Sequence, residues 1–203
     1  IQTLEKYRSV LGQASTNLTA SEFEELVTMP EVVNVIQRIE MVLRIKMEIK
    51  RFINELGNEG RLISMQMEEL VSNIEEEAWL LYKDYAKDDS DEKIREIILG
   101  LKRSTDDELL DVNHIVRLLG YPSSAATSEE YIAARGYRVL NKIPRLPNVI
   151  IHNLVERFGR FPHVITATIE ELDEVDGIGE VRARTIKEGL KRLQEQVFID
   201  RQM

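Results

Sequence analysis

Two glycines one residue apart, Gly177 and Gly179, constrain the fold of this chain more than any other feature. Glycine permits positive φ angles and the close approach of another backbone, so the pair predicts a tight turn. An amphipathic helix is predicted directly after it, with Val181, Ile186 and Leu190 on its apolar face. Because amides at a helix start point outward with the positive end of the helix dipole behind them, this turn can hold an anion through its backbone alone.

The residues before the turn predict a second, shorter helix. Thr168 and Glu171 have the spacing of a capping box, and Leu172 and Val175 then face the core. Helix, glycine turn and helix therefore span about residues 168–192. This layout resembles the helix-hairpin-helix motif of DNA repair and recombination proteins, which bind the DNA backbone without reading its sequence. An ordinary helix C-cap would need only one glycine and would leave the second unexplained.

The motif also defines the predicted DNA-binding residues. The resemblance implies that amides of the turn bind one phosphate and that basic side chains after it add charge. The predicted residues are Gly177, Ile178, Gly179, Glu180, Val181, Arg182, Arg184 and Lys187. Related hairpins further imply a monovalent cation held by carbonyl groups of the turn.

A second copy of this layout, with altered turn residues, precedes the motif at about residues 143–158. Arg145 and Pro147 stand where the two glycines would be. Because proline has no amide proton, we expect this copy to bind phosphate less well. Two roles remain open for it. One is structural, as the pseudo-twofold partner that completes a five-helix unit, and the other is a secondary DNA contact through the charges of Lys142 and Arg145.

The net charge of −9 is unevenly distributed along the chain. Residues 1–134 carry 15 Lys and Arg against 26 Asp and Glu, whereas residues 135–203 carry 12 against 10. DNA binding requires a locally basic face rather than a basic protein. Any DNA contact is therefore predicted within residues 135–203.

Long helical patterns dominate the upstream part. After Pro30, which suits a helix start, apolar residues recur every three or four positions as far as Gly57. A second such pattern runs from Ile63 to Tyr85 after a short link at residues 57–60, and the two helices are predicted to pack antiparallel. No alternating pattern typical of strands is found. The predicted fold class is all-α: an elongated helical spine followed by a small tandem helix-hairpin-helix domain.

Two shorter helices are predicted between the spine and the hairpins, at about 91–103 and 106–119. The second opens at Thr105 and stops at Gly120. The stretch Ser123–Ala126 that follows is predicted to be a linker. We therefore expect two domains, residues 1–125 and residues 126–203.

No residue pattern indicates catalysis or metal binding. The three histidines, His114, His152 and His163, have no partner at metal-ligand spacing, and no catalytic residue is predicted. The chain has no cysteine, which fits a reducing compartment. It also has neither a basic leader nor a long apolar run, so we expect a cytoplasmic protein without membrane contact.

Stretches along the whole chain resemble the DNA integrity scanning family of bacterial diadenylate cyclases. The matching stretches are Ile1–Tyr7, Glu24–Val27, Leu56–Gly60, Leu118–Pro122, Arg135–Arg138, Leu140–Pro147 and Asp173–Ala183. The resemblance implies a nucleotidyltransferase domain that makes cyclic di-AMP from ATP with Mg or Mn, followed by a spine and a helix-hairpin-helix domain. It further implies binding of branched DNA such as Holliday junctions, which suppresses synthesis, a role in DNA damage and repair, a homo-octamer and association with the nucleoid.

The cyclase motifs of that family, Asp-Gly-Ala and Arg-His-Arg, do not occur in this chain. The first residue, Ile1, already belongs to a helical pattern, as expected of a chain cut from a longer one. We therefore predict the spine and the DNA-binding portion, with no cyclase activity and no nucleotide cofactor of its own. Two rival functions remain open: a protein-interaction module, and a structural or oligomerising arm.

Overall fold

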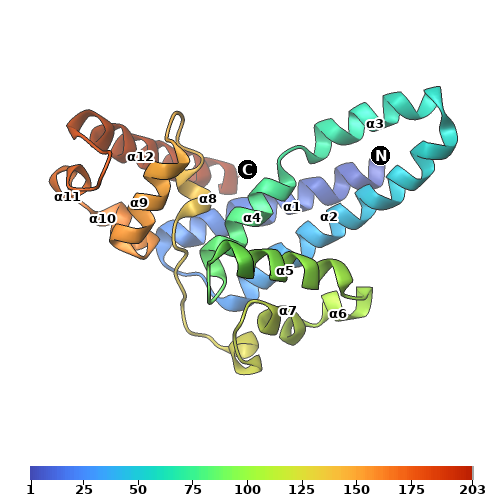
Figure 1. The fold of residues 1–203 in the computed structure, drawn as a ribbon, viewed down its shortest axis with the longest axis horizontal. Helices are drawn as coiled ribbons and strands as arrows, with labels where there is room; N and C mark the ends of the chain where they lie inside the picture. The colour runs from blue at the N-terminus through green and yellow to red at the C-terminus, as the bar shows by residue number, and fades with distance from the viewer. Residues whose placement is uncertain (203) are drawn as a thin grey trace.

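The computed structural model describes residues 1–202, and about 77% of the chain is helical. The all-α prediction is confirmed, since residues 1–202 contain an isolated bridge between Val27 and Ile132 but no strand. Along this part of the chain, no helix combines the length and the apolar character that a membrane span needs. In chain order (Figure 1) the helices are α1 (Gln2–Glu24), α2 (Met29–Leu56), α3 (Asn58–Val71), α4 (Ile74–Tyr85), α5 (Asp91–Arg103), α6 (Asp106–Leu110), α7 (Val112–Leu118), the 3₁₀ helix η1 (Ser123–Thr127), α8 (Tyr137–Leu140), α9 (Asn148–Phe158), α10 (Phe161–Thr166), α11 (Ile169–Asp173) and α12 (Glu180–Gln202).

Three long helices form the spine. Helices α1, α2 and α3 pack against one another along the arm that extends away from the C-terminal helices in Figure 1. Their shared core is apolar and includes the buried side chains of Leu11, Val32, Val42 and Met67. Each such side chain contributes about 1.5–3 kcal/mol by its burial. The predicted antiparallel packing of the two long helices is therefore confirmed for α2 and α3.

The prediction of one long helix from Ile63 to Tyr85 is wrong, because the structure has two helices there. Helix α3 ends at Val71, and Asn73 adopts φ of 68° before α4 begins. Asparagine is one of the few residues other than glycine that tolerate the left-handed region. The apolar spacing does not reveal the break because it continues across it, with Met67 and Ile74 both buried.

The link between α2 and α3 is shorter than predicted. Only Gly57, with φ of 61°, lies outside the helices, and residues 58–60 already belong to α3. Gly60 packs tightly on the preceding helix, since a Cβ there would lie 2.7 Å from the Ile53 carbonyl oxygen.

Two boundaries further along also need correction. The helix predicted at 106–119 is split at Asp111, whose carboxylate accepts the N–H of Asn113 at 3.0 Å and so starts α7. The predicted linker Ser123–Ala126 belongs to η1, which packs on α2 and α7 with Ala126 buried. At Asp111, a short polar side chain starts a new helix where one continuous helix was predicted. At residues 123–127, small residues form a 3₁₀ helix where the composition favoured a loop.

Helices α8 to α12, which we call the C-terminal unit, pack directly on the spine (Figure 1). Helix α12 lies against α1, where Arg201 forms an ion pair of 3.2 Å with Glu24. Phe161 of α10 meets Phe23 of α1 edge-on, with ring centroids 5.4 Å apart. The two predicted domains thus share an interface, and the boundary near residue 125 stays a prediction.

A buried ionic cluster lies in this interface. Arg138 of α8 donates from Nη2 to Glu22 Oε1 of α1 at 2.7 Å and to Thr19 Oγ1 at 2.8 Å. The hydroxyl of Tyr85 in α4 donates to the same Glu22 oxygen at 3.0 Å. Arg138 and Glu22 are each 3% exposed. Loss of either charge would leave the other buried without a partner, and the pair therefore fixes α8 on the spine.

Asp84 of α4 caps the start of α8 within the same interface. Its Oδ1 accepts the N–H groups of Gly136 and Tyr137 at 3.0 and 2.7 Å, and its Oδ2 accepts that of Arg138 at 3.2 Å. Burial, together with the charge of Glu22, raises the pKa of Asp84 to about 7, although the Arg138 charge acts in the opposite direction. The native state therefore retains a proton on Asp84 over a pH range in which an ordinary carboxyl has lost it.

We predict that the contribution of Asp84 to the free energy of unfolding falls as pH rises from about 4 to about 7 and then levels off. The unfolded chain releases this proton near the ordinary pKa of 3.8, whereas the native state holds it. Each pH unit in this window therefore removes up to about 1.4 kcal/mol. Urea unfolding at several pH values measures the slope, which Asp84→Asn should flatten. The exposed control Asp107→Asn should keep it, and an undiminished slope in Asp84→Asn would contradict the prediction.

Candidate DNA-binding site

The second hairpin consists of α11, a turn at residues 174–179 and the start of α12. Thr168 caps α11 as predicted: its hydroxyl accepts the N–H of Glu171 at 3.1 Å, and the Glu171 carboxylate accepts the N–H of Thr168 at 3.3 Å. The N–H of Ile178 donates back to the Val175 carbonyl at 3.0 Å and closes the turn. The predicted order of helix, turn and helix is confirmed.

The two glycines of the turn have different roles. Gly177 has φ of 85°, a conformation that favours glycine, and a Cβ there would lie 2.5 Å from Ile150 Cδ1, so the end of the Ile150 side chain would have to shift. Gly179 does not adopt a positive φ, and a Cβ there would meet nothing within 4 Å. The fold alone does not explain Gly179, whereas a ligand approaching the start of α12 would need this open space.

The start of α12 presents unpaired backbone donors. The N–H of Ala183 donates to the Gly179 carbonyl at 2.9 Å. Within residues 1–202, no hydrogen-bond acceptor is found for the N–H groups of Gly179, Glu180, Val181 and Arg182. Such donors, with the positive end of the helix dipole behind them, attract an anion.

Two of the predicted basic side chains differ in how their charges are compensated. Arg182 folds back and donates from Nη1 to the Gly177 carbonyl at 2.8 Å, and no carboxylate among residues 1–202 pairs with it. Arg184 forms an ion pair of 2.8 Å with Glu180. The charge of Arg182 is therefore available to a phosphate at the turn, and that of Arg184 is already neutralised.

Two other predicted positions are occupied by the fold itself. Lys187 is partly buried and donates from Nζ to the Ile165 carbonyl at 3.1 Å, which ties α12 to the end of α10. Ile178 is 5% exposed, and its N–H is used within the turn. Neither side chain is placed to approach a ligand in this conformation.

The prediction that Val181 faces the core is wrong. Its side chain is 80% exposed, beside the unpaired amides. The buried stripe of α12 consists of Ala183, Ile186 and Leu190. Residue 181 lies off this stripe, which a search for apolar residues alone could not show.

The first hairpin, made of α8, a turn at residues 141–147 and α9, repeats this geometry with fewer donors. Arg145 has φ of 62° at the position equivalent to Gly177. Pro147 has no N–H, and its carbonyl accepts the N–H of Ile150 at 3.0 Å. In the second hairpin the equivalent amide is that of Arg182, which has no acceptor within residues 1–202. The first turn therefore has fewer free amides than the second, and the expectation that it binds phosphate less well stays a prediction.

The basic residues of the first turn are separated by their surroundings. Arg145 is exposed, at the tip of the turn. Lys142 is exposed as well, but it lies closer to the spine, where desolvation and the charge of Arg138 lower the pKa of its ammonium group. Arg145 is the better placed of the two for a secondary contact with DNA.

Sequence reasoning missed two residues of α9 that hold the second turn. Asn153 donates from Nδ2 to the Asp176 carbonyl at 3.0 Å, and Ile150 fills the space beside Gly177. Their spacing of three residues places both on one face of α9. The sequence shows this spacing, but it does not show that this face of α9 contacts the second turn.

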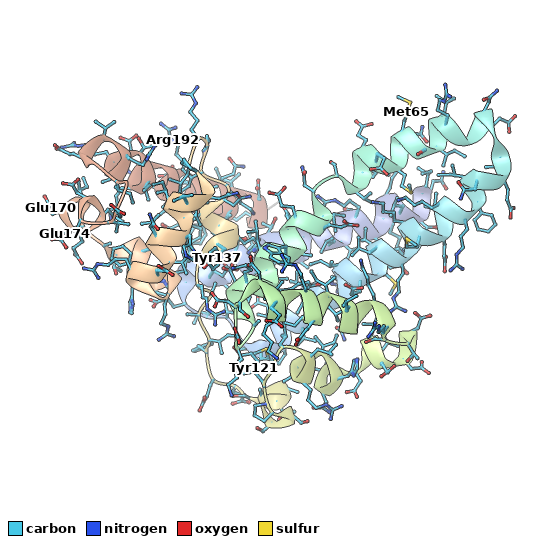
Figure 2. The ribbon with its side chains drawn as sticks, viewed as in Figure 1. Met65, Tyr121, Tyr137, Glu170, Glu174 and Arg192 are labelled. Carbon is cyan, nitrogen blue, oxygen red and sulfur yellow. The ribbon has the colours of Figure 1, made fainter. Side chains whose placement is uncertain are left out.

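Exposed acidic and basic side chains lie on different sides of the second turn. Figure 2 shows Glu170 and Glu174 at the outer end of the C-terminal unit, on the side of α11. Arg182 and Arg192 belong to α12 and are exposed. Because the acidic side repels phosphate, we expect DNA to approach from the side of α12.

Fold and turn together define a helical protein that carries a DNA-binding unit of the helix-hairpin-helix class. Residues 160–189 match the helix-hairpin-helix motif, and residues 1–128 match the family described as the DisA bacterial checkpoint controller linker region. The chain belongs to the DNA integrity scanning protein (DisA) family. Its C-terminal part carries the DNA-binding motif of that family.

Relatives from several bacteria match almost the whole chain. The DNA integrity scanning protein DisA of Carboxydothermus hydrogenoformans is 55% identical over 197 residues, which cover 97% of this chain and 56% of that protein. The proteins of the same name from Bacillus subtilis and Bacillus pumilus are 54% and 53% identical over 206 residues, 100% of this chain and 56% of theirs. The chain therefore spans about half the length of these relatives. It comprises their linker and helix-hairpin-helix parts, without the cyclase domain.

We predict that alanine changes the stability of the fold by different amounts at the two glycines. Gly177→Ala should destabilise the fold by about 1–2 kcal/mol, because alanine at positive φ is strained. Gly179→Ala should change stability by less than about 0.5 kcal/mol, because its Cβ enters open space. Urea unfolding measures both, and equal destabilisation by the two would contradict this division of roles.

Proposed function

We propose that the C-terminal unit binds the phosphate backbone of branched DNA without reading base sequence. The observation that carries this proposal is the set of four unpaired N–H groups at the start of α12, beside the open space at Gly179. A phosphate oxygen accepts from these amides, and the uncompensated guanidinium of Arg182 adds charge. Contacts of this kind fix position on the duplex and leave the base edges unread.

The carbonyl groups of the turn bear on whether a monovalent cation also binds. The Gly177 carbonyl accepts from Arg182 Nη1, and the Asp176 carbonyl accepts from Asn153 Nδ2. Each of these oxygens keeps a second lone pair, so the turn can still offer carbonyl ligands to a monovalent cation. The proposed phosphate contact needs no such ion, because Arg182 already brings positive charge to the same place.

We further propose the setting in which this binding acts. In the whole protein, the unit reports DNA occupancy to a cyclase domain that makes cyclic di-AMP from ATP with Mg or Mn, in the cytoplasm at the nucleoid. One hairpin neutralises few phosphates, so a single copy binds weakly. Several copies in a homo-octamer would meet several arms of a Holliday junction, and this multivalency supplies the preference for branched DNA.

A second candidate function, an oligomerising arm, is favoured by one observation. Large apolar side chains are exposed on the distal half of the spine, on α2 and α3: Met47, Phe52, Leu56, Leu62 and Met65. Figure 2 shows Met65 on the outer side of α3. Sedimentation of the chain tests this role, since a monomer at all concentrations would argue against it. The protein-interaction alternative predicts binding to a partner protein and no effect of reversing the charges of Arg182 and Arg184.

We predict salt-sensitive binding to a four-way junction that is lost in Gly179→Asp. The introduced carboxylate would occupy the phosphate position without disturbing the fold, because the site is open in the free protein. Fluorescence anisotropy at about 50 and about 200 mM salt, with a matched linear duplex beside the junction, measures affinity and its salt dependence. Asp107→Asn, far from the turn in sequence, serves as a folded control.

The outcomes of this experiment separate the alternatives. Loss of binding in Gly179→Asp with unchanged unfolding free energy assigns the phosphate contact to the second turn. Equal binding by Gly179→Asp and the unaltered chain would move the contact to Arg145 or to the outer part of α12, and would refute the proposed site. Equal affinity for junction and duplex would place the junction preference in the assembled protein.

We also predict that Arg182→Gln weakens DNA binding and lowers the salt slope by about one unit, because it removes one phosphate-directed charge. The matched control is the double variant Glu180→Gln/Arg184→Gln, which removes an existing ion pair without changing the net charge. Its affinity and salt slope should stay close to those of the unaltered chain. Equal losses in the two variants would show that Arg182 has no special place at the turn.

A further inference from the structure

One face of α9 holds the turn of the second hairpin. Ile150 packs beside Gly177, Asn153 donates to the Asp176 carbonyl at 3.0 Å, and Arg157 lies 3.6 Å from the Glu174 carboxylate. The three α9 residues are spaced by three and four positions, so they form a single stripe along the helix. All of them belong to the first hairpin, whose own turn has Arg145 and Pro147 in place of the two glycines.

The bond from Asn153 controls the direction of an amide on the opposite side of the turn. In a trans peptide the carbonyl of one residue and the N–H of the next point in opposite directions, and no peptide bond among residues 1–202 is cis. Because the Asp176 carbonyl points toward α9, the Gly177 N–H points away from it, toward solvent. Glycine at positive φ has little steric preference of its own, so this peptide plane needs an external restraint.

The support by side-chain hydrogen bonds runs from the first hairpin to the second and not in the reverse direction. The residue of α12 equivalent to Asn153 is Thr185, and its hydroxyl donates to the Val181 carbonyl of its own helix at 3.0 Å. Among residues 1–202, no side chain of α12 donates to a carbonyl of the first turn. The second turn thus receives a restraint that the first turn lacks.

We propose that Asn153 is a positioning residue for the phosphate-binding turn: it orients the Asp176–Gly177 peptide so that the Gly177 N–H and the unpaired N–H groups of residues 179–182 face the ligand. This assignment rests on the proposed function. It gives the first hairpin a role that its degenerate turn does not suggest, since its second helix acts as the support on which the other hairpin is ordered.

Two readouts test the proposal, one of them without DNA. In Asn153→Ala the amide NMR signal of Gly177 should shift and broaden, and junction affinity should fall roughly three- to tenfold, as expected for one lost hydrogen bond. The unfolding free energy is measured beside it to show that the variant is folded. The matched control Asn141→Ala removes an exposed asparagine of the first turn that makes no side-chain hydrogen bond within residues 1–202, and should change neither readout.

The variant Asn153→Asp adds a test that a general packing role would not pass. Its ionised carboxylate cannot donate to the Asp176 carbonyl, whereas the protonated acid can. Its Gly177 amide signal should therefore return toward that of the unaltered chain as pH falls through about 4, the ordinary pKa of aspartate, and its relative affinity should recover with it. Asn141→Asp, which adds the same charge nearby, controls for simple repulsion of DNA and should lack the recovery in the Gly177 signal.

The outcomes distinguish the two proposals. An unshifted Gly177 signal in Asn153→Ala, or full junction affinity in that variant, would overturn the role of Asn153. Failure of the unaltered chain to bind any DNA would instead refute the proposed function, and the NMR comparison would still show whether Asn153 orients the turn.

Discussion

The buried pair of Arg138 and Glu22 determines where the rest of the C-terminal unit lies. It joins the first helix of the chain to the first helix of that unit, and Asp84 adds the cap of α8 from a third helix. The arrangement lowers the free energy of unfolding, since within residues 1–202 the buried atoms Glu22 Oε2 and Arg138 Nε have no hydrogen-bond partner. A buried ion pair contributes little net stability compared with apolar packing. Its value here is geometric: α8 cannot shift on α1 without separating two charges away from water.

The sequence predicts the regular parts of this fold and misses the points where it changes direction. Periodic apolar residues locate α2 and the capping signals locate α11, because both features are local. The break at Asn73 leaves no mark, since the apolar period continues through it. The cluster of Glu22, Asp84 and Arg138 is equally hidden, because its members are distant in sequence and look like ordinary surface charges until the fold brings them together.

The candidate site shows the same division. Local chemistry identifies the glycine turn and the unpaired amides, since a helix start must leave donors unpaired. Local chemistry does not tell Arg182 from Arg184, or show that Lys187 is used to join α12 to α10. Those distinctions depend on which acceptor lies within reach, and this is a property of the packed unit. The two hairpins have accordingly diverged: one retains the donors, and the other retains the residues that hold them.

Helix α12 connects the phosphate-binding turn to the spine. Its first residues carry the unpaired amides, and further along it packs on α1, ending near the ion pair of Arg201 with Glu24. Its 23 residues span about 34 Å at 1.5 Å per residue. The phosphate turn is therefore attached to the spine twice, through α12 and through the cluster at α8. Because both attachments end on α1, close to Glu22 and Glu24, a force on the turn acts on the same segment of the spine by either route.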